Sequence, residues 1–282
     1  MKIAFCDFWT GFKANSNFFS ELLLLNFEGI RVVHPRKADV IFHSVFGQSH
    51  KKYSALKVLY TGENLSYKNY DSDFAFSFDI TTDDHKNFRL PLWMLQLKWF
   101  RKTNYGNPNL VFDINKLMNP QSDKIIRPIF LAGIFNHDVS ENRMHTMGKL
   151  MNMGKTNFYG APFGNSFKGQ ERSKIKLLKK VKFNLCFEND NTFGYHTEKL
   201  IHAKIAGCIP IYWANSDSVG SDFNIKSFLF ISDPYDSEKF KELEDQMNSK
   251  KFLEDLQVQP LFNTVPQLDG VVHYLTRIIK SA

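Results

Sequence analysis

The sequence predicts an α/β protein built from two doubly wound halves. Short apolar runs rich in β-branched and aromatic residues recur along the chain, and segments with apolar residues at helical spacing separate them. The pattern fades over residues 93–122, which are rich in Asn and Lys, and then begins again. Runs of this kind are typical of parallel strands that helices cover on both faces. We therefore expect one domain over residues 1–126 and a second over residues 127–282.

The first half alternates strands with a helix. Residues 17–26 place Phe18, Phe19, Leu22 and Leu23 at the spacing of a helix that buries one face. The apolar runs around this segment are predicted strands, over residues 3–8, 30–33, 40–46, 57–60 and 74–78.

The second half restarts with a predicted strand over residues 129–132 and a helix over residues 143–151. Residues 168–182 then carry seven basic side chains, and their apolar residues lie at helical spacing. We expect an amphipathic helix there.

A βαβ unit follows. Apolar alternation predicts strands over residues 181–187 and 208–213, with a helix over residues 198–206 between them. Thr197 is the expected N-cap of this helix and Gly207 its end. At the end of the chain, residues 271–280 present one apolar helical face. This face suits either packing against a core, which we expect, or contact with an anionic membrane surface.

Composition narrows the classes of function. The 282 residues carry a net charge of +7, which favours anionic partners. No apolar run approaches the roughly 20 residues that span a bilayer, and the start lacks a signal-peptide pattern. We therefore expect a chain that begins at Met1 and works in the cytoplasm, with at most peripheral contact at the inner face of a membrane. Cys6, Cys186 and Cys208 lie in apolar runs and are expected to be reduced, buried thiols.

The motifs of several enzyme classes are missing from the sequence. It contains no GxGxxG fingerprint, Walker A motif, GxSxG elbow or HExxH pair. Asp71 and Asp73 resemble the DxD metal motif of many nucleotide-sugar transferases, but two Asp before a strand are also typical turn residues. We therefore expect no metal site and no obligatory cofactor.

Polar residues gather in the loop between the strand at 181–187 and the next helix, where Asn189, Tyr195, Glu198 and Lys199 lie. Doubly wound sheets bind anionic ligands at such a place, outside the carboxyl end of a strand and at a helix start. Lys199 could neutralise a diphosphate, Glu198 could bind sugar hydroxyls, and Tyr195 could stack or donate a hydrogen bond. The same residues also suit a capped helix with a surface Glu–Lys pair.

Several blocks of sequence resemble the signature of the α1,3/α1,4-fucosyltransferases, in that family's order and spacing. Around the polar loop they are FNLCFEN at residues 183–189, YHTEK at 195–199 and AGCIPIYW at 206–213. Earlier in the chain, YTGEN at residues 60–64 is similar to the family's acceptor-side motif. Further blocks are DFAFSFD at 73–79, RLPLW at 89–93 and DFNIKSF at 222–228.

The resemblance implies a GT-B-like fold, in which two Rossmann-like domains face each other across a cleft. The first domain would bind the acceptor and the second GDP-β-L-fucose. The implied reaction is an inverting transfer of L-fucose to a hydroxyl of an N-acetylglucosamine or glucose unit. The acceptor would be a glycan such as a lipopolysaccharide O-antigen, and the linkage α1,3 or α1,4. A divalent metal is not obligatory in the family, although it could stimulate, and no nucleic acid is a partner.

The resemblance also assigns roles to residues. Glu63 matches the family's proposed general base, which would take the proton from the acceptor hydroxyl. Asn64 and Arg89 lie in the acceptor-side blocks.

On the donor side, Asn189, Tyr195, Glu198 and Lys199 match positions that contact the donor. Lys199 would hold the diphosphate, whose charge grows as it departs, whereas Glu188 would support the loop. The family has a further diphosphate-binding Arg upstream, for which Lys168 and Arg172 are the candidates.

Two departures from the family pattern bear on the donor loop. His196 stands where a β-branched apolar residue is usual, and Ala214 where Gly is usual. His196 would favour one alternative, a GT-B transferase that uses another nucleotide sugar. The second alternative is a basic nucleic-acid-binding protein, but the basic segment 168–182 lacks interleaved aromatic residues. The acceptor, the linkage and the oligomeric state are not specified by the sequence.

Overall fold

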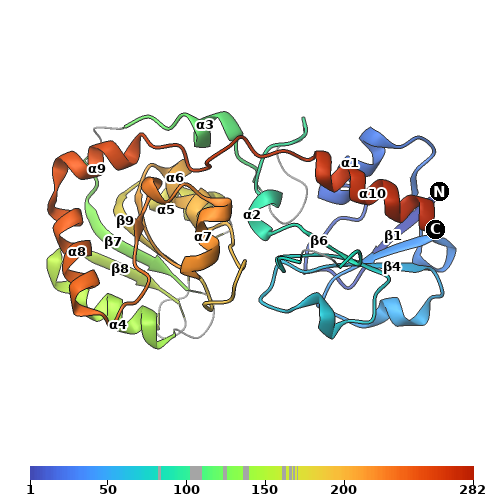
Figure 1. The fold of residues 1–282 in the computed structure, drawn as a ribbon, viewed down its shortest axis with the longest axis horizontal. Helices are drawn as coiled ribbons and strands as arrows, with labels where there is room; N and C mark the ends of the chain where they lie inside the picture. The colour runs from blue at the N-terminus through green and yellow to red at the C-terminus, as the bar shows by residue number, and fades with distance from the viewer. Residues whose placement is uncertain are drawn as a thin grey trace. The chain divides into compact units, whose positions relative to one another are not determined.

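The computed structural model describes residues 1–81, 84–101, 110–122, 126–135, 140–160, 163–164, 167, 169 and 171–282. The chain divides into two compact units (Figure 1). Unit 1 comprises Met1–Val111 and Pro266–Ala282, and unit 2 comprises Phe112–Val265. Each unit is an α/β layer structure around its own parallel sheet.

The sheet of unit 1 is parallel, with the strand order β2-β1-β3-β4-β5-β6. Its central strands are buried on both faces, as the apolar runs in the sequence predict. The strands are β1 (Lys2–Cys6), β2 (Arg31–Val32), β3 (Val40–His43), β4 (Leu56–Tyr60), β5 (Phe74–Ser77) and β6 (Asn87–Arg89).

The helices of unit 1 are α1 (Phe18–Asn26), the one-turn α2 (Leu92–Leu95) and α10 (Asp269–Ser281), with short 3-10 turns η1 (Pro35–Lys37), η2 (Ser49–Lys52) and η3 (Tyr67–Asn69). Helix α1 begins with a reciprocal cap. Oδ1 of Asn17 accepts a hydrogen bond from the Ser20 amide at 2.9 Å, and Oγ of Ser20 accepts one from the Asn17 amide at 2.9 Å. Behind this cap, α1 buries Phe18, Phe19 and Leu23.

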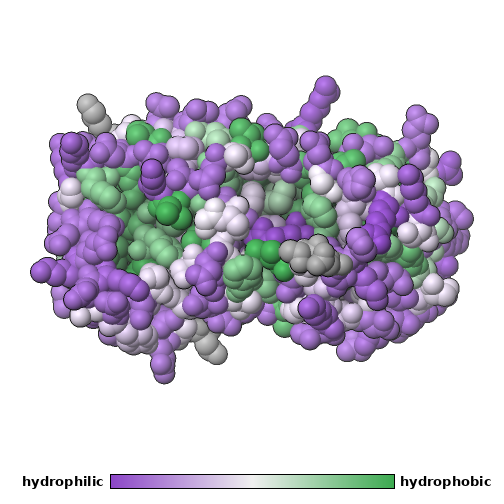
Figure 2. Space-filling model, viewed as in Figure 1, coloured by the Kyte–Doolittle hydropathy of each residue, from purple (hydrophilic) through white to green (hydrophobic). Residues whose placement is uncertain are grey.

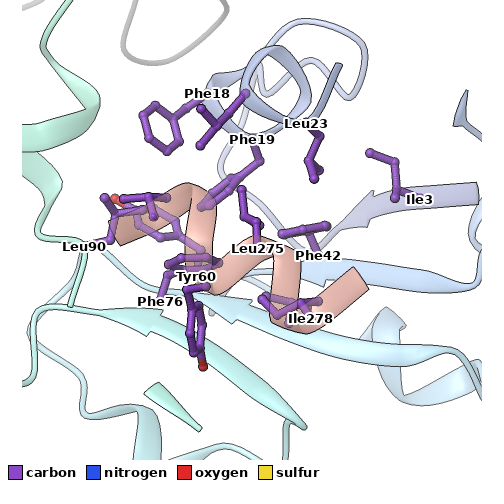
Figure 3. Close-up of a cluster of buried hydrophobic side chains, with 14 of the residues drawn as sticks. Ile3, Phe18, Phe19, Leu23, Phe42, Tyr60, Phe76, Leu90, Leu275 and Ile278 are labelled. Atoms are coloured by element: carbon purple, nitrogen blue, oxygen red, sulfur yellow. The ribbon is translucent and has the colours of Figure 1, made fainter. Parts of the chain in front are cut away.

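Helix α10 belongs to unit 1, although it comes last in the chain. Its residues Val271, Tyr274, Leu275 and Ile278 are buried in the same core as α1, and Figure 3 shows Leu275 and Ile278 among side chains from α1 and the strands. The expected second domain over residues 127–282 therefore differs from the observed division, because the apolar face of α10 finds its partner in the first core. Packing of this face, rather than membrane contact, is what the structure shows.

The sheet of unit 2 is also parallel, with the order β11-β10-β9-β7-β8. Its strands are β7 (Ile129–Ile134), β8 (Thr156–Tyr159), β9 (Val181–Phe187), β10 (Ile209–Trp213) and β11 (Leu229–Phe230). The helices are α3 (Ile114–Met118), α4 (Glu141–Leu150), α5 (Glu171–Leu178), α6 (Lys199–Ala206), α7 (Ser216–Asp222), α8 (Ser237–Asn248) and α9 (Lys250–Gln257), with 3-10 turns η4 (Met151–Met153) and η6 (Ile225–Ser227).

Both sheets reverse their strand order beside their first strand. In unit 1 the chain goes from β1 outwards to β2 and then returns to β3 on the other side. In unit 2 it goes from β7 to β8 and then returns to β9. In doubly wound sheets ligands bind outside the carboxyl ends of the strands at such a reversal. The candidate ligand-binding positions are therefore the carboxyl ends of β1 and β3, and of β7 and β9.

Most predicted elements form where the sequence places them. The expected helix at 198–206 is α6, and Gly207 ends it with a left-handed φ of 73°. The expected N-cap is wrong by one residue: Glu198 holds that position, because the side chain of Thr197 is bonded to Glu188 instead. The strand expected over residues 40–46 stops at His43, since the following residues turn away to bond with Asp7.

The surface of unit 2 has an apolar area. Figure 2 shows mostly hydrophilic residues on the face in view, with a hydrophobic area on the left, where Figure 1 has unit 2. Unit 2 also lines a groove of about 390 Å³ with Lys182 and Ile209, at the amino ends of β9 and β10, and with Leu253 of α9. The groove lies at the edge of the sheet opposite to the carboxyl ends. Within the described part of the chain, no helix is long and apolar enough to cross a membrane.

Candidate active site

A buried carboxylate organises the carboxyl end of β9. Glu188 follows the last residue of this strand and is completely buried. Its Oε1 accepts hydrogen bonds from the Thr197 amide at 2.8 Å and from the Tyr212 hydroxyl at 2.9 Å. Its Oε2 accepts from the Thr197 hydroxyl at 2.7 Å and from Nζ of Lys199 at 2.6 Å. These four bonds satisfy the charge and fold the loop 188–198 back onto the strand ends, so Glu188 is the supporting residue that the sequence predicts.

Lys199 is the first residue of α6, and its side chain is 18% exposed. Nζ donates to Oγ1 of Thr197 at 2.9 Å as well as to Glu188. The ammonium is therefore held beside the helix start, with part of its surface open to a ligand. Amides at a helix N-terminus and a fixed cation together favour an anionic group.

Glu198, the predicted sugar-binding carboxylate, faces a second lysine. Nζ of Lys174, on α5, lies 3.7 Å from its Oε1. Burial alone would raise the pKa of Glu198, but the positive charges of Lys174 and Lys199 lower it to about 2. Glu198 is therefore ionised at neutral pH, and its carboxylate can accept hydrogen bonds from hydroxyl groups.

Arg143, on α4, also lies at this strand end, although no motif in the sequence points to it. It is only 2% exposed. Its Nη2 donates to the carbonyls of Phe187 and Glu188, both at 3.0 Å, and to Oδ1 of Asn189 at 2.9 Å. Its Nε is buried and has no acceptor among the described residues. Burial lowers the pKa of Arg143, whereas Glu188 and Tyr195 act to raise it.

The position of Arg143 follows from the topology. Helix α4 comes after β7, and the loop with Asn189 comes after β9, so the two meet where the strand order reverses. Arg143 could therefore have been predicted only from its position on α4, the first helix after the first strand of unit 2. Its three acceptors include two main-chain carbonyls, which leave no trace in the sequence.

The remaining donor-side candidates lie in different surroundings. Asn189 is exposed next to Arg143, and Tyr195 is buried at 2% exposure. Arg172 is exposed on the first turn of α5, and it is Lys174 of the same helix that reaches the loop. Lys168 lies outside the described residues.

His196 anchors the loop 188–198 to α7. Its Nδ1 lies 2.6 Å from Oδ2 of Asp222, and its Nε2 lies 3.3 Å from the Ser218 hydroxyl. The same hydroxyl accepts a hydrogen bond from the amide of Gly194, whose φ of 80° suits glycine. The ring of His196 is 1% exposed. The histidine therefore joins the loop to α7, and both of its ring nitrogens contact protein side chains.

Unit 1 carries the acceptor-side candidates at the carboxyl edge of its sheet. Glu63 lies three residues after β4 and is exposed, and no group among the described residues pairs with its carboxylate. Its main chain is fixed: the amide donates to Oγ1 of Thr61 at 3.2 Å, and the carbonyl accepts from the Leu65 amide at 2.7 Å. Asn64 is half-buried beside it, and Arg89, the last residue of β6, donates from Nε to the carbonyl of Phe78 at 3.2 Å.

The DxD pair lies at the other edge of this sheet. Asp73 comes just before β5, and its Oδ2 accepts from the Lys57 amide at 2.7 Å, while its own amide donates to the Lys57 carbonyl at 3.0 Å. Asp73 thus joins the amino ends of β4 and β5, which is a turn role. Among the residues that the structure describes, no group of three His, Cys, Asp or Glu side chains could hold a metal ion.

Each unit can therefore perform its own chemical task. At the strand reversal of unit 2, Arg143 and Lys199 supply positive charge, and Glu198 supplies an ionised acceptor of hydrogen bonds. At the carboxyl edge of unit 1, Glu63 supplies an exposed carboxylate on a fixed main chain. Cations that stabilise a departing anion and a carboxylate that accepts a proton are the two groups that an acid–base-assisted displacement needs.

Comparison with known proteins places both units in one family. Residues 3–96 match the alpha-(1,3)-fucosyltransferase FucT N-terminal domain, and residues 129–253 match the C-terminal domain of glycosyltransferase family 10 (fucosyltransferase). The alpha-(1,3)-fucosyltransferase FucT of Helicobacter pylori is 28% identical over 269 residues, which is 84% of this chain and 54% of that protein. The chain thus spans about half the length of this relative. A fucosyltransferase-like protein of Arabidopsis thaliana is 32% identical over 121 residues, 42% of this chain and 22% of that protein.

Solved structures agree on the fold. A crystal structure of an alpha1,3-fucosyltransferase with GDP-fucose superposes with a TM-score of 0.72 at 22% identity, over 99% of this chain and 90% of that one. Another crystal structure of an alpha1,3-fucosyltransferase gives a TM-score of 0.74 at 23% identity, with the same coverage. The fold is of the GT-B type, with two parallel-sheet α/β units, as the sequence predicts. With both of its units matched, the chain belongs to the fucosyltransferases of glycosyltransferase family 10.

Proposed function

We propose that the protein transfers L-fucose from GDP-β-L-fucose to a glycan, with inversion at the anomeric carbon. The acceptor is a hydroxyl of an N-acetylglucosamine or glucose unit, in a glycan such as a lipopolysaccharide O-antigen, and the linkage is α1,3 or α1,4. Family membership supports the sugar and the reaction type, and the Helicobacter pylori relative and the similar crystal structure are both alpha-1,3-fucosyltransferases by name.

In the proposed reaction the acceptor oxygen forms a bond to C1 of fucose. The bond from C1 to the β-phosphate oxygen breaks, and GDP leaves with the electron pair. The proton of the acceptor hydroxyl passes to the carboxylate of Glu63. Attack from the side opposite to the leaving group converts the β-linked donor into an α-linked product.

The observation that carries this proposal is the pair of cations at the strand reversal of unit 2. Arg143 and Lys199 both contact the segment around Glu188, from Nη2 and Nζ respectively. A diphosphate gains negative charge as C1–O bond cleavage proceeds, so fixed cations stabilise the transition state more than the bound donor. We assign the diphosphate to Arg143 and Lys199, and a hydroxyl of fucose or ribose to Glu198. Asn189 and Tyr195 complete the donor site.

We further propose that catalysis needs no metal, because two side-chain cations can supply the charge that a divalent ion would supply. The proposal also places the protein in the cytoplasm, with at most peripheral membrane contact. The three cysteines, all of them free, fit a reducing compartment. Activity that persists in EDTA would support the first point, and activity lost in chelator and restored by Mn²⁺ or Mg²⁺ would refute it.

The deciding experiment measures GDP release from GDP-fucose over a panel of acceptors. The panel contains N-acetyllactosamine, its type-1 isomer and lactose, and NMR of the product gives the linkage. Release that depends on acceptor, with an α-fucosyl product, is expected. If UDP-sugars or GDP-mannose react and GDP-fucose does not, the donor assignment is wrong.

A thermal-shift comparison separates the remaining classes of function. We expect stabilisation by GDP, and little by UDP or by an oligonucleotide. Stabilisation by the oligonucleotide alone would instead identify a nucleic-acid-binding protein.

A further inference from the structure

The sheet of unit 1 has a strand reversal of its own, between β1 and β3. The loops that follow these two strands, residues 7–17 and 44–48, therefore lie at the place where doubly wound sheets bind ligands. Glu63 lies one strand further along the same edge, after β4. The cations assigned to the donor belong to unit 2, so this second reversal has no assigned ligand.

Aromatic side chains gather in these two loops. Trp9 makes edge contacts with Phe8, Phe12 and Phe46, at centroid distances of 5.4, 5.4 and 6.3 Å, and the rings of Phe8 and Phe12 stack at 4.0 Å. We call these four residues the aromatic platform. Phe46 is 51% exposed, and the other three are half-buried. The platform therefore leaves aromatic surface open to solvent at a ligand-binding edge.

A strained residue ties the two loops together. Asp7 has a φ of 59°, the only positive value for a non-glycine residue in the described part of the chain. Its carboxylate accepts hydrogen bonds from the amides of Ser49 and His50, at 3.0 and 2.8 Å, and contacts Nδ1 of His50 at 2.7 Å. Its carbonyl accepts from the amide of Phe46 at 3.1 Å. Strain of this kind persists where the surroundings over-determine a conformation, and it clusters at functional sites.

The two loops approach each other closely at Gly47. A Cβ atom at Gly47 would lie 2.5 Å from Oδ1 of Asp7. Glycine at this position allows the main chain next to Phe46 to pass directly over the Asp7 carboxylate. The aromatic platform is therefore presented on a rigid base, which reduces the entropy lost when a ligand binds.

The platform is joined to the turn that carries Glu63. The Ser44 hydroxyl, at the end of β3, donates to the carbonyl of Tyr60 at 2.7 Å. The ring of Tyr60 meets that of Trp9 edge-on at 6.3 Å, and Glu63 follows Tyr60 by three residues. A saccharide chain with one hydroxyl at Glu63 thus has the platform as its neighbour within the same unit.

We propose that the aromatic platform is a subsite for a hexopyranose of the acceptor glycan, distinct from the unit that is fucosylated at Glu63. This inference rests on the proposed function. A hexopyranose presents an apolar face of C–H groups together with a rim of hydroxyls. Aromatic rings bind such a face, and the exposed Gln48 and Ser49 beside Phe46 suit the rim.

The test replaces Phe46 by alanine, because its exposed ring can be removed without opening the core. The matched control is Leu25→Ala, at a 68% exposed position on α1. With N-acetyllactosamine as acceptor, F46A should raise the acceptor KM about tenfold, the scale of one lost aromatic contact. The KM for GDP-fucose should stay unchanged, L25A should behave as the wild type, and F46W should restore binding.

A binding measurement makes the test independent of turnover. Saturation-transfer NMR of the wild type with GDP and N-acetyllactosamine should give the strongest signals on the C–H protons of one sugar face, and F46A should lose them. An unchanged acceptor KM in F46A, or equal NMR signals in both proteins, would overturn the subsite. If F46A weakens GDP binding instead, the platform holds the guanine base, and the acceptor assignment is likewise wrong.

Failure of the proposed function would look different. In that case the wild type would release no GDP from GDP-fucose with any acceptor of the panel. The platform would still be judged by NMR, with N-acetyllactosamine and lactose as the probes. Contact in the wild type that disappears in F46A would support a saccharide subsite, and absence of contact in the wild type would refute it.

Discussion

Nζ of Lys199 lies 2.6 Å from Oε2 of Glu188, a carboxylate with no exposed surface. Glu188 has three further hydrogen bonds, two from Thr197 and one from Tyr212. The carboxylate is therefore stabilised without depending on Lys199 alone. The lysine is held in place but stays partly exposed, so its charge is available to a diphosphate at little cost in side-chain entropy.

Replacement of Lys199 by alanine should impair the use of the donor. In the proposed reaction the ammonium would stabilise charge that grows on the departing diphosphate, so both a higher KM for GDP-fucose and a lower kcat are expected. Loss of one such group typically lowers kcat by about 10²-fold or more. Steady-state kinetics with varied GDP-fucose provide the measurement.

Lys176→Ala is the control for Lys199→Ala, since Lys176 is exposed on α5. It should leave kinetics unchanged. A normal kcat/KM in Lys199→Ala would show that this lysine faces solvent in the complex with the donor.

Because His196 and Asp222 contact each other, the effects of replacing them on the free energy of unfolding should not be additive. Both side chains are nearly inaccessible, with exposures of 0% and 4%. His196→Val leaves the Asp222 carboxylate buried without its 2.6 Å partner, which is costly. In denaturant unfolding we expect the single variant to lose about 3 kcal/mol, and the double variant His196→Val/Asp222→Ala to lose less than the sum of the two single variants.

Additivity of the two single variants would disprove that coupling. The KM for GDP-fucose supplies a second readout. If the contacts of His196 with Asp222 and Ser218 position the loop 188–198 for the donor, His196→Val should raise this KM. The increase should appear even at a temperature where the variant is fully folded. A KM that stays at the wild-type value would show that the contact between His196 and Asp222 contributes to stability but not to donor binding.

A buried histidine in unit 1 should make stability depend on pH. His43 has no exposed surface and stacks on His50 with ring centroids 3.7 Å apart. Burial, reinforced by His50, lowers the pKa of His43 from 6.5 to about 4. Between these values the unfolded chain binds a proton that the folded protein does not, so stability falls as pH falls from 6.5 to 4.

The expected loss from His43 alone is about 2 kcal/mol between pH 7 and pH 5. His43→Gln should therefore show a smaller decrease of stability than the wild type over this range, measured by denaturant unfolding. His273→Gln, at an exposed position on α10, is the control.

Asp7 and its partner His50 remain in both proteins, and the lowered pKa of Asp7, about 2, places the titration of Asp7 below this pH range. Equal pH dependence in His43→Gln and the wild type would mean that His43 is not kept neutral by folding.

The sequence predicts the fold where the signal is local. Strands β3 and β5 are buried over their whole length and apolar except for their last residues, His43 and Ser77, and such runs are recognisable. The strands β6 and β11 are only three and two residues long, too short for any periodicity. Helix α10 shows an apolar face in the sequence, but the core that receives this face contains α1 and β1, from the opposite end of the chain. No local pattern carries that contact.

The candidate site divides in the same way. Asn189 ends the motif block at 183–189, and Glu198 and Lys199 end the next block at 195–199, so a resemblance in sequence singles them out together. Arg143 enters from another helix and bonds to the carbonyls of Phe187 and Glu188, which every residue type possesses. Its role becomes visible only when the strand order places α4 beside the end of β9.

The last prediction concerns Glu63. Attack by a sugar hydroxyl at neutral pH is slow unless its proton is removed as the new bond forms, and a positioned carboxylate typically contributes about 10²–10⁴-fold. Glu63→Gln keeps the size of the side chain and part of its hydrogen bonding but cannot accept that proton. We therefore expect kcat to fall by about this factor, while the KM of the acceptor changes little and GDP binding stays intact, since the residues proposed to bind the donor lie in unit 2.

Because Glu63 is exposed and its main chain is held by Thr61 and Leu65, the substitution should leave the fold unchanged. A thermal melt with and without GDP checks this for each preparation. Asp71→Asn, at an exposed position of the same unit, is the matched control and should retain full kcat. If Glu63→Gln melts normally, binds GDP and still turns over at the wild-type rate, the proton passes to another group. Restoration of activity in Glu63→Ala by added formate or azide would identify the missing function as that of a base or a nucleophile at this position, because a small anion can occupy the space of the lost carboxylate.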